Sequence, residues 1–368
     1  MTPLEAALAA INAVDCEANA VISAKCRGLI RGYHERWHDD IGDFIPTGVE
    51  KVYSTRLLNP ATGKSSTVMG TAGKIDLEYR RRSNGVTGIL DHKSTSDDIS
   101  DPAGTYWRTE AVNNQSNHYM LMKWTLGDKV TEATWDCIRK PTINPKQLKS
   151  KAEHAAIVAS GKYCNQTMPP ATMEWLQTNQ SEDLAMYEAR LFQDCTEVRP
   201  NNYFQRRALP RLDSELMDYA SDLWDASQLV LEARRKNRWS KHPGSCMAYG
   251  SPCRFLGICS GFDQPDSCNW KPRESVHSEL TQEQDKDTLT FSSIRCFQTC
   301  PRKFYYAYQL GIEKVTDEES EALRIGNLIH LALEAYWKAL LPKENENGNC
   351  TNSASSVESA STKTSCPF

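Results

Sequence analysis

Apolar side chains recur at intervals of three and four residues along several stretches of the chain. This spacing places them on one face of a helix and predicts amphipathic helices. Two such stretches fall within residues 3–38, and others follow further along the chain: 107–126, 213–230, 291–310 and 318–341.

Short alternating or continuous apolar runs between residues 49 and 140 have the pattern of strands instead. The pair Asn84-Gly85 between two of these runs favours a tight turn. Since strands and helices follow one another, we expect an α/β fold. The expected strands are 49–58, 70–79, 86–93 and 130–140.

Three stretches are too polar to be assigned to a core. Residues 142–180 are polar and irregular, and residues 260–288 have the Asp-, Gln-, Ser- and Pro-rich composition of a linker. The last stretch, 343–368, is rich in Asn, Ser, Thr and Glu and has little to bury, so we expect a disordered tail.

Composition and charge exclude several classes of protein. The 368 residues contain 43 Lys and Arg against 47 Asp and Glu, a net charge of −4. This balance excludes a uniformly basic nucleic-acid coat but leaves room for a local basic groove. The chain has no run of about 18 apolar residues and begins without the pattern of a secretory signal. We therefore expect a cytoplasmic protein with no membrane partner.

Two carboxylates and a lysine on neighbouring predicted strands are candidates for catalysis. Asp76 ends the run Gly73-Lys74-Ile75-Asp76, whereas Asp91 and Lys93 follow an apolar pair. Because side chains alternate along a strand, Asp91 and Lys93 point to the same face. With Asp76 on the paired strand, the three groups could hold a divalent cation for phosphodiester cleavage. The alternative is an ordinary salt bridge between strands.

Two further groups of residues are consistent with this chemistry. Gln115 and Tyr119 are four positions apart on a predicted helix and share a face. Arg80, Arg81 and Arg82 could contact the phosphates of a nucleic acid, or could be solvated charge at a strand end.

Thirteen cysteines occur, and three of them are closely spaced: Cys246, Cys253 and Cys259. Gly and Pro residues break the chain between these three, which allows their thiols to converge. With a fourth, more distant cysteine they could form a site for an iron–sulfur cluster or zinc. Unligated thiols are the alternative.

The combination of Gly-x-x-Asp, Asp-x-Lys after an apolar run, and Gln-x-x-x-Tyr on a helix resembles the RecB-type branch of the PD-(D/E)XK nucleases. Residues 293–306 resemble the family's opening helix, and the run from Gly326 to His330 resembles its Gly-x-x-x-His helix. The resemblance implies a restriction-endonuclease-like central mixed sheet flanked by helices. It also implies a deoxyribonuclease that depends on Mg²⁺ or Mn²⁺.

The same resemblance implies roles for single residues. Lys93 would position the attacking water, and Gln115 and Tyr119 would support Lys93 and the DNA strand. The implied metal ligands are Asp76, Asp91, His330 and the backbone carbonyl of His92.

The cysteines resemble those of the family's iron–sulfur subgroup, which includes AddB-type nucleases and CRISPR-associated RecB-like exonucleases. This resemblance implies a cysteine-cluster subdomain whose [4Fe–4S] cluster clasps the ends of the domain, with structural Zn²⁺ as the alternative. The implied cluster ligands are Cys246, Cys253, Cys259 and Cys300.

The order of the motifs departs from the family, in which the opening helix and the histidine helix precede the strands. Either the chain is circularly permuted, with 291–341 folding back onto 15–260, or 291–341 begins a second, truncated nuclease module. We favour permutation, because a cluster joining Cys300 to Cys259 would hold the family's natural ends together. A linker of about thirty residues then connects them at little cost, since loop closure grows slowly with length.

The permuted interpretation divides the chain into four parts. Residues 1–240 form a nuclease core with the metal-site strands and helical insertions, and 241–275 form a cysteine-rich cluster segment. Residues 276–342 complete the core with helices, and 343–368 are the tail.

We therefore expect an enzyme that hydrolyses phosphodiester bonds of DNA, as an exonuclease rather than a site-specific endonuclease. DNA repair, recombination or phage DNA processing is the expected context, with a helicase or recombination partner by analogy. The alternative is a catalytically inactive DNA-binding or assembly subunit that retains the cluster.

Overall fold

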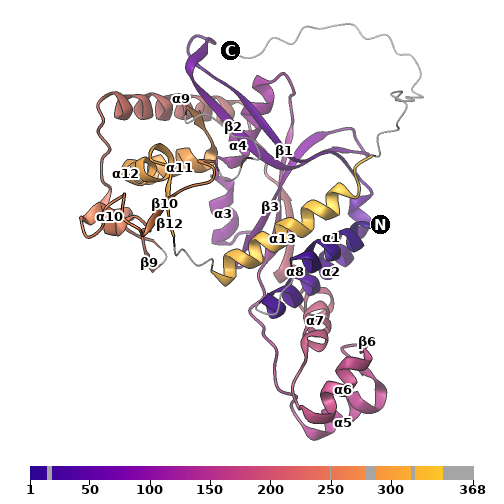
Figure 1. Cartoon of the computed structure of the whole chain (residues 1–368). Helices are drawn as coiled ribbons and strands as arrows, with labels where there is room; N and C mark the ends of the chain where they lie inside the picture. Colours follow the sequence, from indigo (N-terminus) through magenta and orange to yellow (C-terminus); the bar gives the residue numbers. More distant parts are fainter. Residues whose placement is uncertain (15–18, 249, 278–279, 281–286, 316–319, 343–368) are drawn as a thin grey trace, which may run out of the picture.

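A central mixed sheet organises the protein (Figure 1). The computed structural model describes residues 1–14, 19–248, 250–277, 280, 287–315 and 320–342. The sheet has the strand order β1-β2-β3-β4-β7, and the short β11 (Thr288–Leu289) pairs in parallel with β2. The α/β prediction with a mixed sheet is thereby confirmed. The strands are β1 (Phe44–Leu58), β2 (Ser65–Arg81), β3 (Thr87–Thr95), β4 (Glu132–Arg139) and β7 (Phe204–Ala208).

Strand β3 lies inside the sheet, and its residues 88–92 are buried. It pairs antiparallel with β2 and parallel with β4. A parallel pair needs a crossover connection, and this one runs through α3 (Thr105–Ala111) and α4 (Gln115–Thr125). The helix expected at 107–126 is therefore two helices, separated by residues 112–114.

One face of the sheet is covered by helices from both ends of the chain and by one from its middle (Figure 1). A capping box between Thr2 and Glu5 starts the first of these helices, and Ser320 caps the last. Tyr33 and Trp337 are fully buried in the core that these helices share with the sheet. The helices are α1 (Pro3–Ala13), α2 (Ala20–Ile41), α7 (Leu184–Gln193) and α13 (Glu321–Lys338).

The opposite face is covered by α4, by the long helix α9 (Asp213–Arg235) and by α11 (Phe291–Thr299). The buried side of α9, including Leu216 and Leu223, packs in two adjoining clusters against α4 and α11. Helices from the middle and the end of the chain thus support the same face of the sheet.

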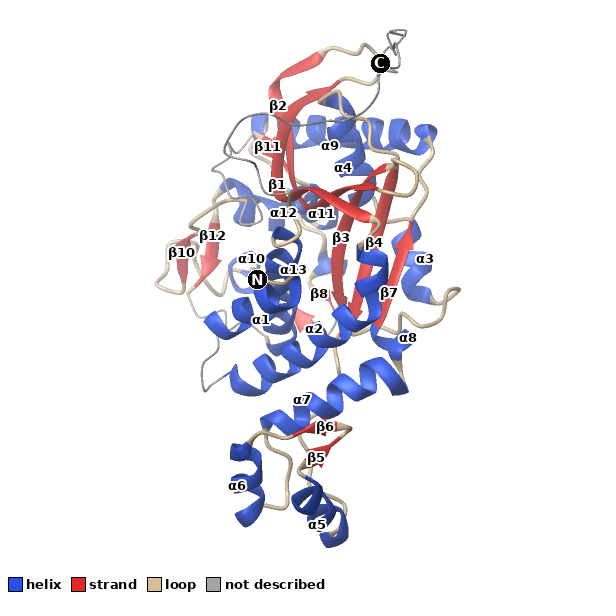
Figure 2. Cartoon of the chain, turned by 90° about the vertical axis from the view of Figure 1, so that its right-hand side faces the viewer, coloured by secondary structure: helices blue, strands red, loops and turns tan. Residues whose placement is uncertain are grey.

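The stretch expected to be irregular, 142–180, forms a lobe apart from the sheet (Figures 1 and 2). It contains α5 (Lys151–Ser160), α6 (Pro170–Thr178) and a hairpin of β5 (Lys162–Tyr163) and β6 (Gln166–Thr167). Periodicity does not reveal this lobe because its helices contribute few core residues; α5, for example, buries only Ile157.

The cysteine-rich stretch is folded from very short elements. They are the hairpin of β8 (Met247–Ala248) and β9 (Ser251–Pro252), α10 (Leu256–Ser260), and β10 (Trp270–Pro272), which pairs with β12 (Ile312–Lys314). The linker prediction is wrong at β10. Trp270 is buried there and stacks on Phe255 at 5.3 Å between ring centroids, a contact that the surrounding polar residues conceal in the sequence.

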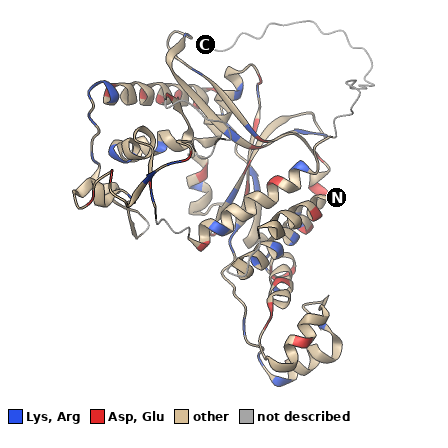
Figure 3. Cartoon of the chain, in the orientation of Figure 1, with Lys and Arg blue, Asp and Glu red and all other residues tan. Residues whose placement is uncertain are grey.

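Figure 3 shows Lys and Arg interspersed with Asp and Glu over the molecule, in keeping with the nearly balanced charge. Among the described residues, no helix has the length and apolar character needed to cross a bilayer. The expected disordered tail, 343–368, lies outside the described residues.

Candidate active site

A cavity opens where β2 and β3 stop pairing. Their ladder runs as far as Leu77 opposite Leu90. Beyond it, the backbone N–H of His92 donates a hydrogen bond to the Oδ2 atom of Asp76 at 2.9 Å. The cavity has a volume of about 310 Å³. It is lined by Gly73, Lys74, Asp76, Asp91, His92, Lys93, Ser94, Gln115, Tyr119, Thr290, Phe291, Ser292 and His330.

Asp91 and Lys93 lie on the same face of β3, as alternation requires, and helix α4 holds both in place. The Nζ atom of Lys93 lies 2.5 Å from Asp91 Oδ2 and donates to Gln115 Oε1 at 2.5 Å. The Gln115 amide donates in turn to Asp91 Oδ1 at 3.0 Å and to the Tyr119 hydroxyl at 2.9 Å. Lys93 also lies over the ring of Trp135 on β4, 4.7 Å from its centroid. The four predicted residues therefore form one connected network.

Burial and neighbouring charges shift the pKa values of the ionisable groups in and beside this network. Burial alone would lower the pKa of Lys93, but the carboxylate of Asp91 raises it overall. Burial and the charge of Asp91 together raise the pKa of Asp76 to about 7. Asp91 is thus paired with Lys93 but still acts on Asp76, and a bound cation would offset the charge of both carboxylates.

Helix α13 brings His330 to the same cavity. Its Nδ1 atom lies 3.8 Å from Asp76 Oδ2. Burial of the ring and the neighbouring His92 lower the pKa of His330, which favours the neutral imidazole that ligates metals. One turn earlier, a Cβ atom on Gly326 would lie 2.9 Å from Ser94 Oγ. The glycine therefore allows α13 to approach β3 closely enough for His330 to reach Asp76.

Gly73 permits a second close approach. A Cβ atom there would lie 2.8 Å from Cε1 of Tyr119, less than any ordinary contact between carbon atoms. Tyr119 itself is buried against β2 and accepts the hydrogen bond from Gln115. The glycine of the Gly-x-x-Asp pattern and the tyrosine of Gln-x-x-x-Tyr are thus parts of one packing arrangement.

Carboxylates and an imidazole are suitable donors for Mg²⁺ or Mn²⁺. Asp76, Asp91 and His330 therefore fit such an ion in chemical type, and a bound cation would counteract the burial and the Asp91 charge that raise the pKa of Asp76. Within the described residues, however, no three His, Cys, Asp or Glu side chains are already grouped closely enough to hold a metal. A metal would have to draw these ligands together.

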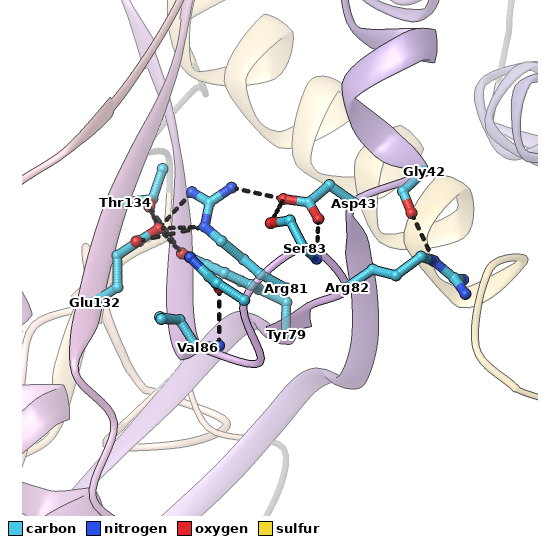
Figure 4. Close-up of polar contacts among 10 residues, drawn as sticks. Gly42, Asp43, Tyr79, Arg81, Arg82, Ser83, Val86, Glu132 and Thr134 are labelled. Carbon is cyan, nitrogen blue, oxygen red and sulfur yellow. Dashed lines mark hydrogen bonds and ion pairs between the residues drawn. The ribbon is translucent and has the colours of Figure 1, made fainter.

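The three arginines predicted to contact DNA lie at the turn between β2 and β3, outside this cavity. Arg81 is engaged structurally, with its guanidinium 2.5 Å from Glu132 and 3.3 Å from Asp43 (Figure 4). Arg82 donates to the backbone carbonyl of Gly42 at 3.2 Å and is exposed, as is Arg80. A role of Arg80 and Arg82 in DNA binding stays a prediction.

The cysteine segment packs against the residues that follow α12 (Pro301–Phe304), where Phe255 and Ile258 share a cluster with Tyr306. Lys241 donates to the carbonyl of Cys259 at 2.6 Å, and Arg302 on α12 donates to the carbonyl of Trp239 at 3.0 Å. Burial raises the pKa of Cys259, and the nearby thiols of Cys246 and Cys300 act in the same direction. Lys241 thus contacts Cys259, and the adjacent His242 contacts the carbonyl of Thr299, next to Cys300. Cys300 therefore stands on a stretch beside the triplet, although these thiols do not form a ready-made metal site.

The sequence interpretation missed a buried polar network behind β3. Asp136 on β4 lies opposite His92 in the parallel register and binds its ring at 3.0 Å. Tyr33 donates to the same carboxylate at 2.6 Å, and Arg206 on β7 forms an ion pair with it at 3.1 Å. The sequence does contain a signal for this network, because Asp136 places a charge in the middle of an otherwise apolar strand, between Trp135 and Cys137.

The comparisons with known proteins concern the C-terminal part of the chain. Residues 288–363 match the family model described as the PD-(D/E)XK nuclease superfamily. The match includes α11 and α13 with His330, but not β2 and β3. No curated protein and no solved structure matches the chain. The stretch that supplies His330 to the cavity is therefore similar to the PD-(D/E)XK nuclease superfamily.

Proposed function

We propose that this protein is a metal-dependent nuclease that hydrolyses phosphodiester bonds of DNA. The observation that carries the proposal is the cavity between β2 and β3. There Asp76, Asp91 and Lys93 meet His330, which comes from a segment matching the nuclease superfamily model. A purely structural salt bridge would explain why Lys93 lies beside Asp91. It would not explain why Gln115, Tyr119 and His330 line the same cavity.

The contacts support a role for each of these residues. An Mg²⁺ or Mn²⁺ ion bound by Asp76, Asp91 and His330 would supply positive charge to the phosphate and lower the pKa of a bound water. Lys93 presents an ammonium to the same cavity, where it orients the water and offsets the charge that develops on the phosphate. Gln115 holds Lys93 and Asp91 in a fixed geometry, and Tyr119 holds Gln115.

Cleavage of labelled DNA with Mg²⁺, Mn²⁺ or EDTA tests the proposal. We expect cleavage that requires the metal and falls at least about 100-fold in Lys93→Met and Asp91→Asn, because both groups face the reacting phosphate. Lys51→Met is the matched control, since Lys51 is half exposed on β1 and lies outside the cavity. Wild-type cleavage rates in Lys93→Met would contradict the proposal.

We propose further that the enzyme is an exonuclease, acting in DNA repair, recombination or phage DNA processing in the cytoplasm, with a helicase or recombination partner. This finer assignment rests on the resemblance to RecB-type nucleases. Degradation of linear but not closed circular DNA supports it, whereas nicking or linearisation of the circle contradicts it.

We also propose that the segment 291–341 completes the same nuclease unit, as in a circular permutation. The proximity of His330 to Asp76, and the packing of α13 with α1 and α2, support this arrangement. If instead the segment begins a second module, His330→Ala will leave cleavage unchanged. If it completes the first, the substitution will weaken both metal binding and cleavage.

For the cysteine segment we propose a [4Fe–4S] cluster, with structural Zn²⁺ as the alternative. The support is the backbone hydrogen bond from Cys253 to Cys246 at 2.7 Å, the contacts of Lys241 and His242 with Cys259 and Thr299, and the soft thiolate donors, which suit both metals. Anaerobic purification followed by visible absorption and metal analysis distinguishes iron from zinc. A colourless protein without either metal contradicts the proposal.

A second candidate is a DNA-binding or assembly subunit that does not cleave. The observation that favours it is the separation of the metal-ligating side chains within the described residues. DNA binding without any bound Mn²⁺ or Mg²⁺ in calorimetry would support this candidate over the nuclease.

A further inference from the structure

The imidazole of His92 is buried behind Asp91 and Lys93 and is held by a carboxylate. Its side chain is 4% exposed, and its Nδ1 atom lies 3.0 Å from Asp136 Oδ2. Asp136 is ion-paired with Arg206 at 3.1 Å and so acts as a hydrogen-bond acceptor. The Nδ1 atom must therefore be the donor, which leaves a lone pair on Nε2 of the neutral ring.

That Nε2 atom has no hydrogen-bond partner among the described residues and is inaccessible to solvent. Buried nitrogen atoms are almost always satisfied, because leaving one unpaired costs free energy. An imidazole whose other nitrogen donates to a carboxylate is the usual arrangement of a histidine that ligates a metal. Because His92 is among the residues that line the cavity, its unsatisfied nitrogen points to a ligand there.

The neighbouring donors lie at suitable distances. The rings of His92 and His330 have centroids 6.3 Å apart, and His330 Nδ1 lies 3.8 Å from Asp76 Oδ2. Ligand atoms about 2.1 Å from one ion are at most about 4.2 Å apart, and the centroids of two ligating imidazoles reach about 6.5 Å apart when the rings bind from opposite sides of the ion. Both separations fall within these limits. Rotation of His330, which is 38% exposed on α13, would complete the approach.

We propose that the imidazoles of His92 and His330, together with the carboxylate of Asp76, hold one transition-metal ion, and that Asp136 orients His92 for this purpose. The proposal rests on the proposed metal-dependent function and deepens it, because it assigns the side chain of His92 rather than its carbonyl as the ligand. Two imidazole ligands favour Mn²⁺ over Mg²⁺, which prefers oxygen atoms and retains its water.

Direct metal binding tests the proposal without reference to activity. Pulsed electron paramagnetic resonance of the Mn²⁺-loaded full chain should show two coupled imidazole nitrogens in the wild type and one in His92→Gln. Calorimetry should show Mn²⁺ affinity at least about 10-fold lower in His92→Gln, with Mg²⁺ affinity changed less than about 2-fold. His38→Gln is the matched control, because His38 is half exposed on α2.

A single coupled nitrogen in the wild type would overturn the proposal, and this measurement stands even if His92→Gln does not fold. Unchanged Mn²⁺ affinity in a folded His92→Gln variant would overturn it as well. The two proposals fail separately. Mn²⁺-dependent cleavage with one coupled nitrogen contradicts only the role of His92, whereas two coupled nitrogens without cleavage contradict only the nuclease function.

Discussion

The cavity between β2 and β3 and the cysteine segment (241–275) were both expected to gather distant residues around a metal, but the structure organises them to different degrees. In the cavity, Lys93, Asp91, Gln115 and Tyr119 form a continuous network of hydrogen bonds, and His330 approaches Asp76. In the segment, Lys241 and His242 link Cys259 to Thr299, next to Cys300, but no three thiols are grouped in the described chain.

The difference follows from what surrounds each set of side chains. The cavity residues stand on long strands and helices whose register and packing are fixed by large apolar clusters. Cys246 and Cys253 flank the two-residue strands β8 and β9, and Cys259 lies on the five-residue α10. This segment buries few large side chains, chiefly Phe255, Ile258 and Trp270. Because these short elements do not fix the positions of the thiols, a bound metal would have to do so, as in small metal-stabilised domains.

The largest effect is therefore expected in the cysteine segment. If a metal organises it, Cys300→Ser will abolish the bound metal and lower the free energy of unfolding by about 5 kcal/mol or more, because binding energy is folding energy there. Denaturant unfolding followed by circular dichroism measures this. Cys195→Ser is the control, since Cys195 is equally buried but distant from the triplet. If Cys195→Ser lowers the free energy of unfolding as much as Cys300→Ser does, a metal does not organise the cysteine segment, and the proposed difference from the cavity is wrong.

In the cavity, disturbance of the scaffold should reduce activity more than stability. Gly73→Ala places a methyl group against the ring of Tyr119 and should lower stability by about 1–3 kcal/mol. Because Tyr119 holds Gln115, and Gln115 holds Lys93, we expect cleavage to fall about 10- to 100-fold. The assay is cleavage at constant temperature beside a thermal melt. Gly244→Ala, where the added methyl meets nothing within 4 Å, is the control, and equal cleavage by the two variants would contradict the coupling.

The sequence was most informative where periodicity and short motifs agree. The strands β1 to β4, the helices α1, α2 and α13, and the alternation of Asp91 with Lys93 all follow from local patterns that the long elements preserve. Spacing alone also placed Gln115 and Tyr119 on one face, and the structure joins them by a hydrogen bond of 2.9 Å.

The rest depends on contacts between residues far apart in the chain. The lobe with α5 and α6 buries single residues from short elements, so no period marks it. The pairing of β10 with β12 depends on one tryptophan, Trp270, in a polar stretch. The link between His92 and Asp136 exists only in the parallel register of β3 and β4, which the sequence does not specify.

Lowering the pH should lower the free energy of unfolding, because one buried histidine beside the sheet resists protonation. His118 on α4 is hydrogen-bonded to Tyr219 at 2.8 Å and to the carbonyl of Ala72 at 3.2 Å, and burial lowers its pKa to about 4. An unfolded histidine titrates near 6.5, so between pH 6.5 and 4 the unfolded chain binds the additional proton. Stability is therefore highest above pH 6.5 and should fall by about 2 kcal/mol between pH 7 and 5 on this account.

The variant His118→Gln isolates this contribution, because glutamine does not titrate. Urea unfolding of both proteins at pH 7 and pH 5 should show a loss about 2 kcal/mol smaller in the variant than in the wild type. Parallel losses would mean that the acid sensitivity of the sheet region arises elsewhere.

The smallest effect concerns the turn between β2 and β3, where three adjacent arginines differ in their surroundings. Arg81 lies between Glu132 and Asp43 and over the ring of Phe44 at 4.6 Å, whereas Arg80 and Arg82 are exposed. Arg81→Gln should therefore lower stability by about 1 kcal/mol, the value typical of a partly exposed ion pair, with little effect on DNA affinity.

Arg80→Gln should leave stability unchanged but weaken DNA binding and reduce its dependence on salt, if this turn contacts phosphates. Binding titrations at two salt concentrations, beside thermal melts, separate the two roles. A different result would contradict these assignments: the salt dependence of DNA binding is reduced in Arg81→Gln but not in Arg80→Gln. In that case the ion pairs of Arg81 must break when DNA binds, and the turn takes part in the same function as the cavity.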